Sequence, residues 1–338
     1  MEKVKVGIVG LGRLGIEHAK NLAFNIPNAE LIAVCSVVEK EVNELVKDWN
    51  IPYGYTDYNE MIQNKELDAV AVLSPSPYHV EHITAALEQG LHVFVDKPLG
   101  VTIEECKTAE SAVEAHSDKV FMIGFMRRYD PSYAHAKNLI KQGKIGTPFL
   151  IRCSSIDPEH TIKDAIRFGA TSGGLFIDMT VHDIDLARWF LEQEVDQIYA
   201  IGGSYAHKEF EAYGDGDNVC ALMKFKNNSM AMFHSGRNAA HGYHVETEIV
   251  GTKGTLRIAA EPKKNLCTIF DDTGVVNECS QNFQERFAEA YRLEMQEFID
   301  CIVEGRKPEI SVYDGTKNTE VAFAATKAFR ENKLIQLD

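Results

Sequence analysis

The first turn of the chain constrains its fold more than any other segment does. The stretch VKVGIV at 4–9 reads as a short buried strand, the sequence GLGRLG at 10–15 follows directly, and a helical stretch comes next. A strand, then G-x-G-x-x-G, then a helix is the fingerprint of a dinucleotide-binding crossover. Gly10 permits the tight turn, Gly12 lets a pyrophosphate approach the backbone, and Gly15 lets the helix pack closely on the strand. The alternative is an ordinary strand–helix turn that binds no ligand.

The pattern of expected strands and helices changes at about residue 125. Before it, short strands rich in Val, Ile and Ala alternate with helices, which implies a parallel sheet covered on both faces. After it, the expected strands follow one another closely with turn signals between them, which is typical of an antiparallel sheet. The sequence therefore predicts an α/β Rossmann domain with a doubly wound parallel sheet at 1–124. It predicts an α+β domain with a large, mostly antiparallel open sheet at 125–338.

These patterns give a set of expected elements. The expected strands are 4–9, 30–36, 53–55, 69–73, 92–95, 120–124, 149–155, 197–203, 219–225, 230–236, 246–250, 255–259 and 268–271. The expected helices are 16–22, 40–49, 58–63, 78–88, 103–115, 131–142, 178–191, 285–303 and 313–331.

Charge and composition exclude several classes of partner. The chain has 338 residues and a net charge of −15, which argues against nucleic acid because binding phosphates needs a basic face. No run of 18 apolar residues predicts a membrane span, and no apolar signal region precedes the first strand. The seven cysteines are scattered with no CxxC pair, which favours reduced thiols. We therefore expect a cytoplasmic protein whose partner is a small molecule.

The end of the second expected strand bears on the choice of dinucleotide. Ser36 stands where an acidic residue usually bonds the adenosine ribose. Glu39 is close enough in sequence to serve instead, whereas Arg13 could face the 2′-phosphate of NADP. We favour NAD and leave NADP open.

Two further loops follow strands of the expected parallel sheet, at the edge where such sheets bind ligands. The first holds Ser74, Ser76 and His79; His79 is either a cofactor contact or simply the first turn of a helix. The second holds Lys97, directly after an apolar strand; a lysine there is costly unless it is used, although a surface lysine at a turn is the alternative. The expected cofactor-binding residues are Gly10, Gly12, Arg13, Leu14, Ser36, Ser74, Ser76, His79 and Lys97.

A second candidate centre lies at the start of the expected helix 178–191. Asp178 and His182 are four residues apart and would share a helix face, so a carboxylate could orient an imidazole that moves a proton. Taken alone, the pair is better read as an acidic helix start and a core histidine. We expect no metal site here or at His241 and His244, because these spacings do not converge on one point.

Together these motifs resemble a known family. The sequences GLGRLG at 10–15, DKPLG at 96–100, GFMRRYD at 124–130 and the D-x-x-x-H of 178–182 occur in the order found in the glucose–fructose oxidoreductase / inositol dehydrogenase / rhizopine catabolism (Gfo/Idh/MocA) family. The resemblance covers essentially the whole chain. The segment DMTVHDIDLARWF at 178–190 is most similar to the inositol 2-dehydrogenases of that family.

The resemblance implies an activity and a set of roles. It implies oxidation of a ring secondary alcohol of myo- or scyllo-inositol by hydride transfer to NAD, with Lys97, Asp178 and His182 as the catalytic set. It also implies that Arg127, Asp157 and Tyr243 contact the substrate, and that the open sheet mediates a homotetramer. The family usually has Glu-Lys-Pro where this chain has Asp96-Lys97-Pro98, and the shorter acid changes how the lysine is held.

Two other functions fit the same motifs. Aldose, deoxysugar and trans-dihydrodiol dehydrogenases share the Lys-Pro pair and the Asp/His pair. A regulator that binds a dinucleotide and catalyses no reaction is the alternative from another class. The intact set of Lys97, Asp178 and His182 argues against it.

Overall fold

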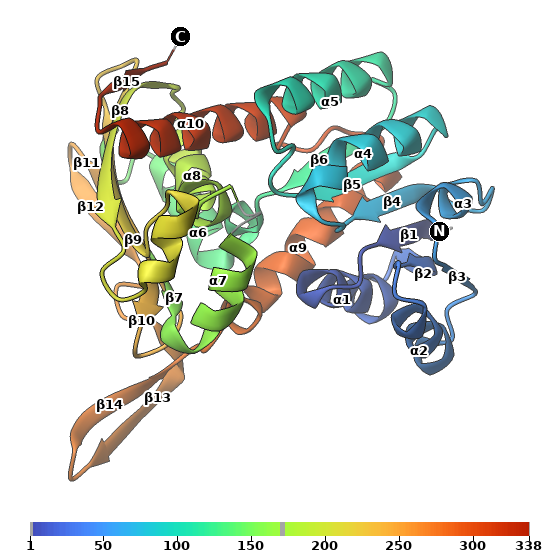
Figure 1. The fold of residues 1–338 in the computed structure, drawn as a ribbon, viewed down its shortest axis with the longest axis horizontal. Helices are drawn as coiled ribbons and strands as arrows, with labels where there is room; N and C mark the ends of the chain where they lie inside the picture. The colour runs from blue at the N-terminus through green and yellow to red at the C-terminus, as the bar shows by residue number, and fades with distance from the viewer. Residues whose placement is uncertain (1–2, 170–172, 338) are drawn as a thin grey trace. The chain divides into compact units, whose positions relative to one another are not determined.

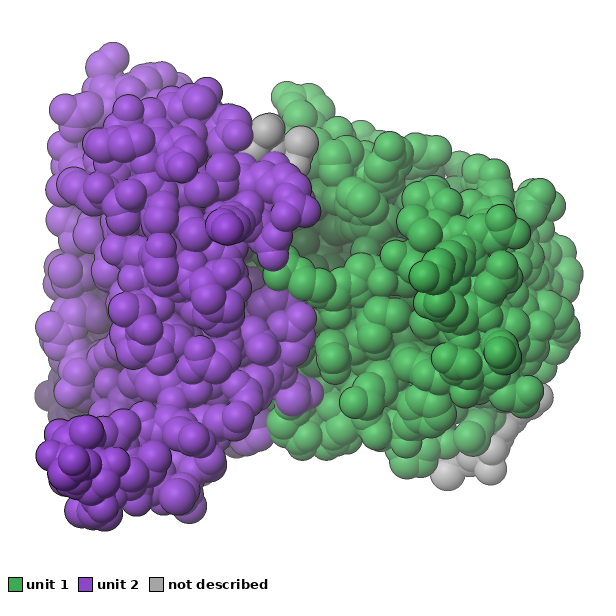
Figure 2. Space-filling model, turned by 60° about the horizontal axis from the view of Figure 1, so that its bottom comes forward, with its two compact units in different colours: residues 1–129, 289–319 green, residues 130–288, 320–338 purple. Residues whose placement is uncertain are grey.

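The computed structural model describes residues 3–169 and 173–337 (Figure 1). The chain divides into two compact units, which Figure 2 colours separately: unit 1 is 1–129 with 289–319, and unit 2 is 130–288 with 320–338. The division falls inside α9 (Phe283–Glu304) and α10 (Val312–Glu331), so each of these helices contributes to both units. None of the described helices is long and apolar enough to cross a membrane.

Unit 1 is built on a six-stranded sheet in which every neighbouring pair is parallel, in the order β3-β2-β1-β4-β5-β6. This doubly wound order confirms the predicted Rossmann architecture. Sheets of this kind bind ligands at the carboxyl ends of their strands, at the point where the order reverses, which is here between β1 and β4. The strands are β1 (Val4–Val9), β2 (Ala29–Cys35), β3 (Tyr53–Tyr55), β4 (Ala69–Val72), β5 (His92–Asp96) and β6 (Phe121–Gly124). The helices between them are α1 (Arg13–Lys20), α2 (Glu39–Trp49), α3 (Tyr58–Ile62), α4 (His79–Glu88) and α5 (Ile103–Ala115).

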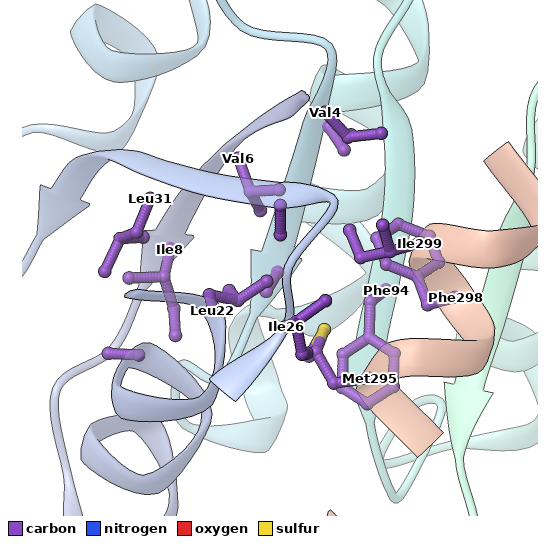
Figure 3. Close-up of a cluster of buried hydrophobic side chains, with 14 of the residues drawn as sticks. Val4, Val6, Ile8, Leu22, Ile26, Leu31, Phe94, Met295, Phe298 and Ile299 are labelled. Carbon is purple, nitrogen blue, oxygen red and sulfur yellow. The ribbon is translucent and has the colours of Figure 1, made fainter. Parts of the chain in front are cut away.

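The core of unit 1 includes side chains from the far end of the chain. Met295, Phe298 and Ile299 of α9 are fully buried in the same cluster as Ile8 of β1 and Phe94 of β5 (Figure 3). Their spacing places the three α9 side chains on one helix face. Burying a side chain of this size stabilises a fold by about 1.5–3 kcal/mol. The α9 face is therefore part of the Rossmann core.

Unit 2 is built on a seven-stranded sheet in the order β12-β11-β7-β10-β9-β8-β15. All neighbouring pairs are antiparallel except β7 and β10, which confirms the prediction of a mostly antiparallel sheet. Buried and exposed residues alternate along β9, so one face of the sheet is covered and the other is open. The strands of the sheet are β7 (Pro148–Pro158), β8 (Val195–Gly203), β9 (Asn218–Phe225), β10 (Met230–Ala239), β11 (His244–Gly251), β12 (Gly254–Ile258) and β15 (Ile335–Gln336).

Unit 2 also contains three α-helices of its own and a separate hairpin. The helices are α6 (Pro131–Lys141), α7 (Ile162–Gly169) and α8 (Val181–Leu191), and the hairpin pairs β13 (Lys263–Asp271) with β14 (Gly274–Cys279). The sequence analysis did not predict α7 or β14. β14 is largely exposed and so lacks a regular alternation of buried and polar residues, whereas α7 has a half-buried face but is only eight residues long, shorter than the helices that such patterns predict well.

Candidate functional site

The glycine loop lies between β1 and α1 at the carboxyl edge of the parallel sheet. Gly10 has a φ of +93°, and a side chain there would collide with the carbonyl of Leu73. A Cβ at Gly15 would collide with the carbonyl oxygen of Gly10. In contrast, no described atom lies within 4 Å of a Cβ built on Gly12. The fold itself therefore requires the outer two glycines, whereas Gly12 leaves open space in front of the backbone.

The start of α1 suits an anion. Gly12 is its N-cap and provides no side-chain hydrogen bond, and the first turn, which begins at Arg13 and Leu14, holds no acidic residue. The first N–H groups and the positive end of the helix dipole are therefore available to phosphate. The open space at Gly12 together with this uncapped helix start fits the pyrophosphate of NAD.

Ser36 follows β2 at the same edge of the sheet and is nearly buried. Its hydroxyl donates a hydrogen bond to Oε2 of Glu41 at 2.8 Å and accepts one from the backbone N–H of Val38 at 3.2 Å. Glu41 belongs to the first turn of α2. The carboxylate that meets this strand end is thus that of Glu41; the sequence analysis had suggested Glu39.

His79 connects the loops that follow β4 and β5. The ring is buried, with Nε2 lying 2.8 Å from the carbonyl oxygen of Ser74 and Nδ1 lying 2.7 Å from that of Pro98. Carbonyl oxygens only accept, so the ring donates to both of them only when it is protonated. Burial lowers the pKa of His79, and the two carbonyls oppose that shift. The ring holds the loop that begins at Ser74 against the Lys97-Pro98 segment, while Ser76 opens a short 3₁₀ turn at Ser76–Tyr78.

Lys97 is half-buried between Asp96 and Pro98, and the Lys97–Pro98 peptide bond is cis. Burial raises the pKa of Asp96 to about 6, and the neighbouring charge of Lys97 opposes this shift. The acid in front of the lysine is therefore only partly ionised near pH 6 and contributes less than a full negative charge there.

In unit 2, the segment that carries Asp178 is a π-helix at Phe176–Thr180, which runs into α8. This corrects the prediction of a single α-helix from 178. The side chain of Asp215 accepts a hydrogen bond at 3.0 Å from the backbone N–H of Leu175, directly before the π-helix. At its other end, Thr180 Oγ1 lies 2.8 Å from Ser235 Oγ of β10. Side chains from outside the helix thus fasten it at both ends, and π-helical turns are frequent at functional sites.

Arg237 of β10 joins two of the predicted site residues. Its Nη2 donates to Oδ2 of Asp178 at 2.8 Å, and its Nη1 lies 3.6 Å from Oδ2 of Asp157 at the end of β7. The guanidinium is almost fully buried, and it lies over the ring of Phe210, 5.6 Å from its centroid. Burial alone would lower the pKa of Arg237, but Asp178 and Asp157 outweigh it and hold the pKa above its ordinary value. Arg237 therefore stays charged and fixes both carboxylates.

The other predicted residues have the following positions. His182 is half-buried in the first turn of α8, and its neighbour Asp183 accepts a hydrogen bond from Ser155 of β7 at 3.0 Å. Tyr243 is buried, and its ring meets Phe287 edge-on at 6.2 Å. Arg127 is buried in a 3₁₀ turn of unit 1.

The predicted residues are divided between the units. The unit 1 residues are the glycine loop, Ser36, Ser74, Ser76, His79, Lys97 and Arg127, and the unit 2 residues are Asp157, Asp178, His182 and Tyr243. Within 3–169 and 173–337, no group of three or more His, Cys, Asp or Glu residues is arranged to hold a metal ion.

Comparison with known proteins decides the family. Residues 4–125 match a family model described as an oxidoreductase family with an NAD-binding Rossmann fold, and residues 133–257 match the GFO/IDH/MocA C-terminal domain. The chain belongs to the GFO/IDH/MocA family. It is therefore an oxidoreductase of a family whose Rossmann domain binds NAD, as the glycine loop predicts.

Several relatives that match this GFO/IDH/MocA chain over nearly its whole length are inositol dehydrogenases. The chain is 34% identical to the scyllo-inositol 2-dehydrogenase (NAD(+)) of Bacillus subtilis, over 99% of this chain and 97% of that protein. It is 44% identical to scyllo-inositol dehydrogenase from Lactobacillus casei, solved with bound NAD(H) and scyllo-inositol, with a TM-score of 0.96 over 99% of both chains. It is 35% identical to myo-inositol 2-dehydrogenase from Lactobacillus plantarum, with a TM-score of 0.97 over 100% of both chains.

Sequence reasoning missed Arg237, Asp215 and Glu41 of this GFO/IDH/MocA chain. Arg237 comes directly after the expected strand 230–236, and an arginine at the end of an apolar strand needs a carboxylate when it is buried. The sequence therefore indicated that Arg237 needs a carboxylate partner, but it did not indicate which carboxylate that is. Asp215 and Glu41 gave no such signal, because acidic residues in loops and first helical turns are usually solvated.

Proposed function

We propose that this protein oxidises a ring secondary alcohol of scyllo-inositol to the corresponding inosose, with NAD as the oxidant. The observation that carries the proposal is the 44% identity, over 99% of both chains, to a Lactobacillus casei enzyme solved with NAD(H) and scyllo-inositol. myo-Inositol is the second candidate, because the Lactobacillus plantarum relative that acts on it matches over 100% of both chains. NAD, when bound, supplies the hydride acceptor.

His182 is the proposed general base. The hydroxyl proton of the substrate must leave as the C–H bond breaks, and an imidazole is suited to take it because its ordinary pKa lies near physiological pH. The α8 backbone that carries His182 is anchored by the hydrogen bond from Ser155 to Asp183. A base held this way contributes about 10²–10⁴ to the rate.

Lys97 is the proposed electrostatic stabiliser. Its ammonium group would donate to the reacting oxygen and favour the negative charge that develops there. The buried ring of His79 lies 2.7 Å from the Pro98 carbonyl oxygen and so fixes the backbone next to Lys97.

Asp178 and Asp157 are the proposed acceptors for hydroxyl groups of the ring, and Tyr243 and Arg127 are proposed as further substrate contacts. Arg237 supports the proposal for the two carboxylates, because its buried guanidinium lies 2.8 Å from Asp178 and 3.6 Å from Asp157 and so holds both of them in place. Ionised carboxylates only accept hydrogen bonds, so they suit a polyol whose ring presents many O–H donors.

The test is the initial rate of NADH formation with a panel of polyols. The panel contains scyllo-inositol, myo-inositol, glucose, xylose and a 1,5-anhydro sugar. We expect kcat/KM to be highest for scyllo-inositol. A misplaced hydroxyl in a site built to bond hydroxyls leaves a buried polar group unpaired, so isomers should differ markedly. If kcat/KM is highest for myo-inositol, the preferred isomer is myo-inositol and not scyllo-inositol. If kcat/KM is highest for a sugar, the assignment to inositol is wrong.

The same panel tests a non-catalytic role. A regulator would bind NADH and yet reduce no NAD with any polyol. The presence of Lys97, Asp178 and His182 together favours the enzyme.

We also propose that the protein is a homotetramer assembled through the open face of the unit 2 sheet. Four apolar side chains on this face are about half exposed, which is unusual for a monomer. They are Ile201 at 53%, Leu222 at 57%, Met230 at 45% and Met232 at 45%. Met232 pairs directly with Leu222 across β9 and β10, so these two residues form one continuous patch. Light scattering after size exclusion should give four chains, and Leu222→Lys should lower that number.

We also propose that the protein is cytoplasmic, because its seven cysteines are scattered with no CxxC pair, a pattern that favours reduced thiols. Fractionation of the source cells would test this assignment.

A further inference from the structure

The end of β2 has a serine in place of the usual acidic residue, but the structure brings the carboxylate of Glu41 to this strand end. In a Rossmann domain the residue that ends the second strand bonds the adenosine ribose, and an acidic residue there accepts from the ribose hydroxyls. This chain has Ser36, whose hydroxyl hydrogen is already directed at Oε2 of Glu41 at 2.8 Å. The serine therefore does not offer a free acceptor pair of its own. It holds the side chain of Glu41 at the end of β2.

The surroundings of Glu41 leave its negative charge available. Glu41 is half-buried in the first turn of α2, and none of the described lysines or arginines makes a recorded ion pair with it. The nearest lysine in sequence, Lys40, lies 3.7 Å from Glu44 instead. Glu39 adds a second negative charge to the same turn. A phosphate dianion approaching this strand end would therefore meet net negative charge.

We propose that Glu41 selects the dinucleotide: its carboxylate, held by Ser36, accepts hydrogen bonds from the adenosine ribose diol and repels a 2′-phosphate. The chain thus discriminates for NAD over NADP with an acidic residue from α2 in place of one from β2. This inference rests on dinucleotide binding and is independent of which polyol is oxidised.

Arg13 represents the opposing effect. It opens α1, in the same loop as the open space at Gly12, and its side chain is exposed. An exposed cation contributes little against a partly buried carboxylate that a hydrogen bond already orients. Glu41 should therefore dominate the choice.

The test is direct binding of NADH and NADPH, measured by fluorescence titration of the purified protein with no polyol present. We expect the unmodified protein to bind NADH at least about tenfold more tightly than NADPH, since a hydrogen bond to a charged group contributes about one factor of ten or more. Glu41→Gln keeps the size and removes the charge. It should weaken NADH binding, strengthen NADPH binding and bring the ratio of the two dissociation constants close to one.

Two matched variants make the test specific. Glu39→Gln removes the same charge from the same helical turn, but Glu39 is exposed and Ser36 does not hold it, so this variant should change the ratio much less than Glu41→Gln does. Ser36→Ala keeps the charge but releases the carboxylate, so it should weaken NADH binding by a few-fold while NADPH binding stays weak. Thermal melting of each variant verifies that the fold is retained.

The outcomes separate this inference from the proposed function. If Glu41→Gln leaves the ratio unchanged, or if Glu39→Gln changes it equally, Glu41 is not the selecting residue. If no polyol is oxidised but the ratio responds to Glu41→Gln as expected, the selection by Glu41 stands and the proposed reaction fails.

Discussion

The two units build their candidate sites from different materials. In unit 1 the cofactor loop is a continuous stretch of six residues, and its important groups are backbone N–H groups and the absence of side chains at Gly10, Gly12 and Gly15. In unit 2 the centre around Arg237 is made of charged side chains from β7, the π-helix and β10. A site made of backbone groups can be recognised from one short, continuous motif in the sequence. A site made of paired charges exists only after distant segments have met.

The same comparison extends to the polar groups that each unit buries. In unit 1, Nε2 of His18 lies 3.7 Å from Oε1 of Glu294, and both side chains are fully enclosed. Burial lowers the pKa of His18 to about 3 and raises that of Glu294 well above its ordinary value, so burial favours the neutral form of both groups. Arg237 is buried almost as deeply and stays charged, because two carboxylates face it. The number of opposing charges, more than burial itself, decides whether a buried group is ionised.

The sharpest way to separate the two sites is to remove the proposed base from unit 2. His182→Ala should lower kcat by about 10²–10⁴-fold, because a general base contributes this much. NADH binding should persist, since the cofactor loop belongs to unit 1. Steady-state rates and fluorescence titration measure the two effects, with the exposed His135→Ala as control. Near-normal turnover of His182→Ala would remove His182 from the catalytic set.

The next largest effect is expected at Arg237. Arg237→Met removes the charge that faces Asp157 and Asp178, and it should lower the free energy of unfolding by about 3 kcal/mol. This is the lower end for breaking a buried pair, because both carboxylates are partly exposed. Arg237→Lys keeps the charge and should lose less. Urea unfolding measures the stability, and kcat for the polyol measures the positioning of Asp178. Equal stability of Arg237→Met and the unmodified protein would contradict the charged cluster.

A pair of identical substitutions tests the backbone site. Gly12→Ala places a methyl group in open space, so the fold should keep its melting temperature, while the dissociation constant for NADH should rise by about tenfold or more as the pyrophosphate is pushed away. Gly15→Ala forces a collision with the Gly10 carbonyl and should lower the melting temperature itself. Thermal melts and titrations distinguish the two. If Gly12→Ala bound NADH normally, the open space would not be the phosphate site.

The smallest effect is expected for the buried pair of His18 and Glu294 in unit 1. Because the pKa of His18 is about 3 in the folded protein and near 6.5 when unfolded, its contribution to stability is full above pH 6.5 and is lost as the pH falls toward 3. Glu294 has the opposite sign: its contribution is full below pH 4.5 and is lost as the pH rises. His18→Phe should therefore flatten the loss of stability between pH 6.5 and pH 4.5.

Urea midpoints at several pH values measure this effect, and His116→Phe serves as the control. His18 packs against Phe94 and Tyr291, so phenylalanine fits the same ring contacts. A pH profile that His18→Phe left unaltered would mean that His18 is not buried in its neutral form.

The sequence predicted the architecture of unit 1 well because its signals are local. The bounds expected for β1 and α5 are those observed, since an apolar run marks the strand and the capping residue Thr102 marks the start of the helix. The pairing of Arg237 with Asp178 could not be predicted in this way, because the two residues are 59 positions apart and nothing in either segment names the other. The π-helix was missed too, and the residues that hydrogen-bond at its two ends, Asp215 and Ser235, are likewise distant in the sequence.

In the candidate site, the residues proposed to contact the substrate were easier to predict than the residues that hold them in place. Asp178 and Asp157 were chosen from the sequence by resemblance, and the structure brings both of them to Arg237. Glu41 illustrates what is lost when a position is read alone: Ser36 is uninformative until the side chain that it holds is seen. Functional roles for these residues remain the subject of the experiments above.

The position of α9 in the core of unit 1 has a consequence for how the protein is made. A nascent chain that has just left the ribosome at Tyr129 contains all six strands of the parallel sheet but not Met295, Phe298 or Ile299. Part of the apolar core of this sheet stays uncovered until the intervening segment and α9 have been translated. We therefore expect completion of the Rossmann domain to be a late, post-synthetic event, and the ribosome-bound intermediate to be a client for chaperones.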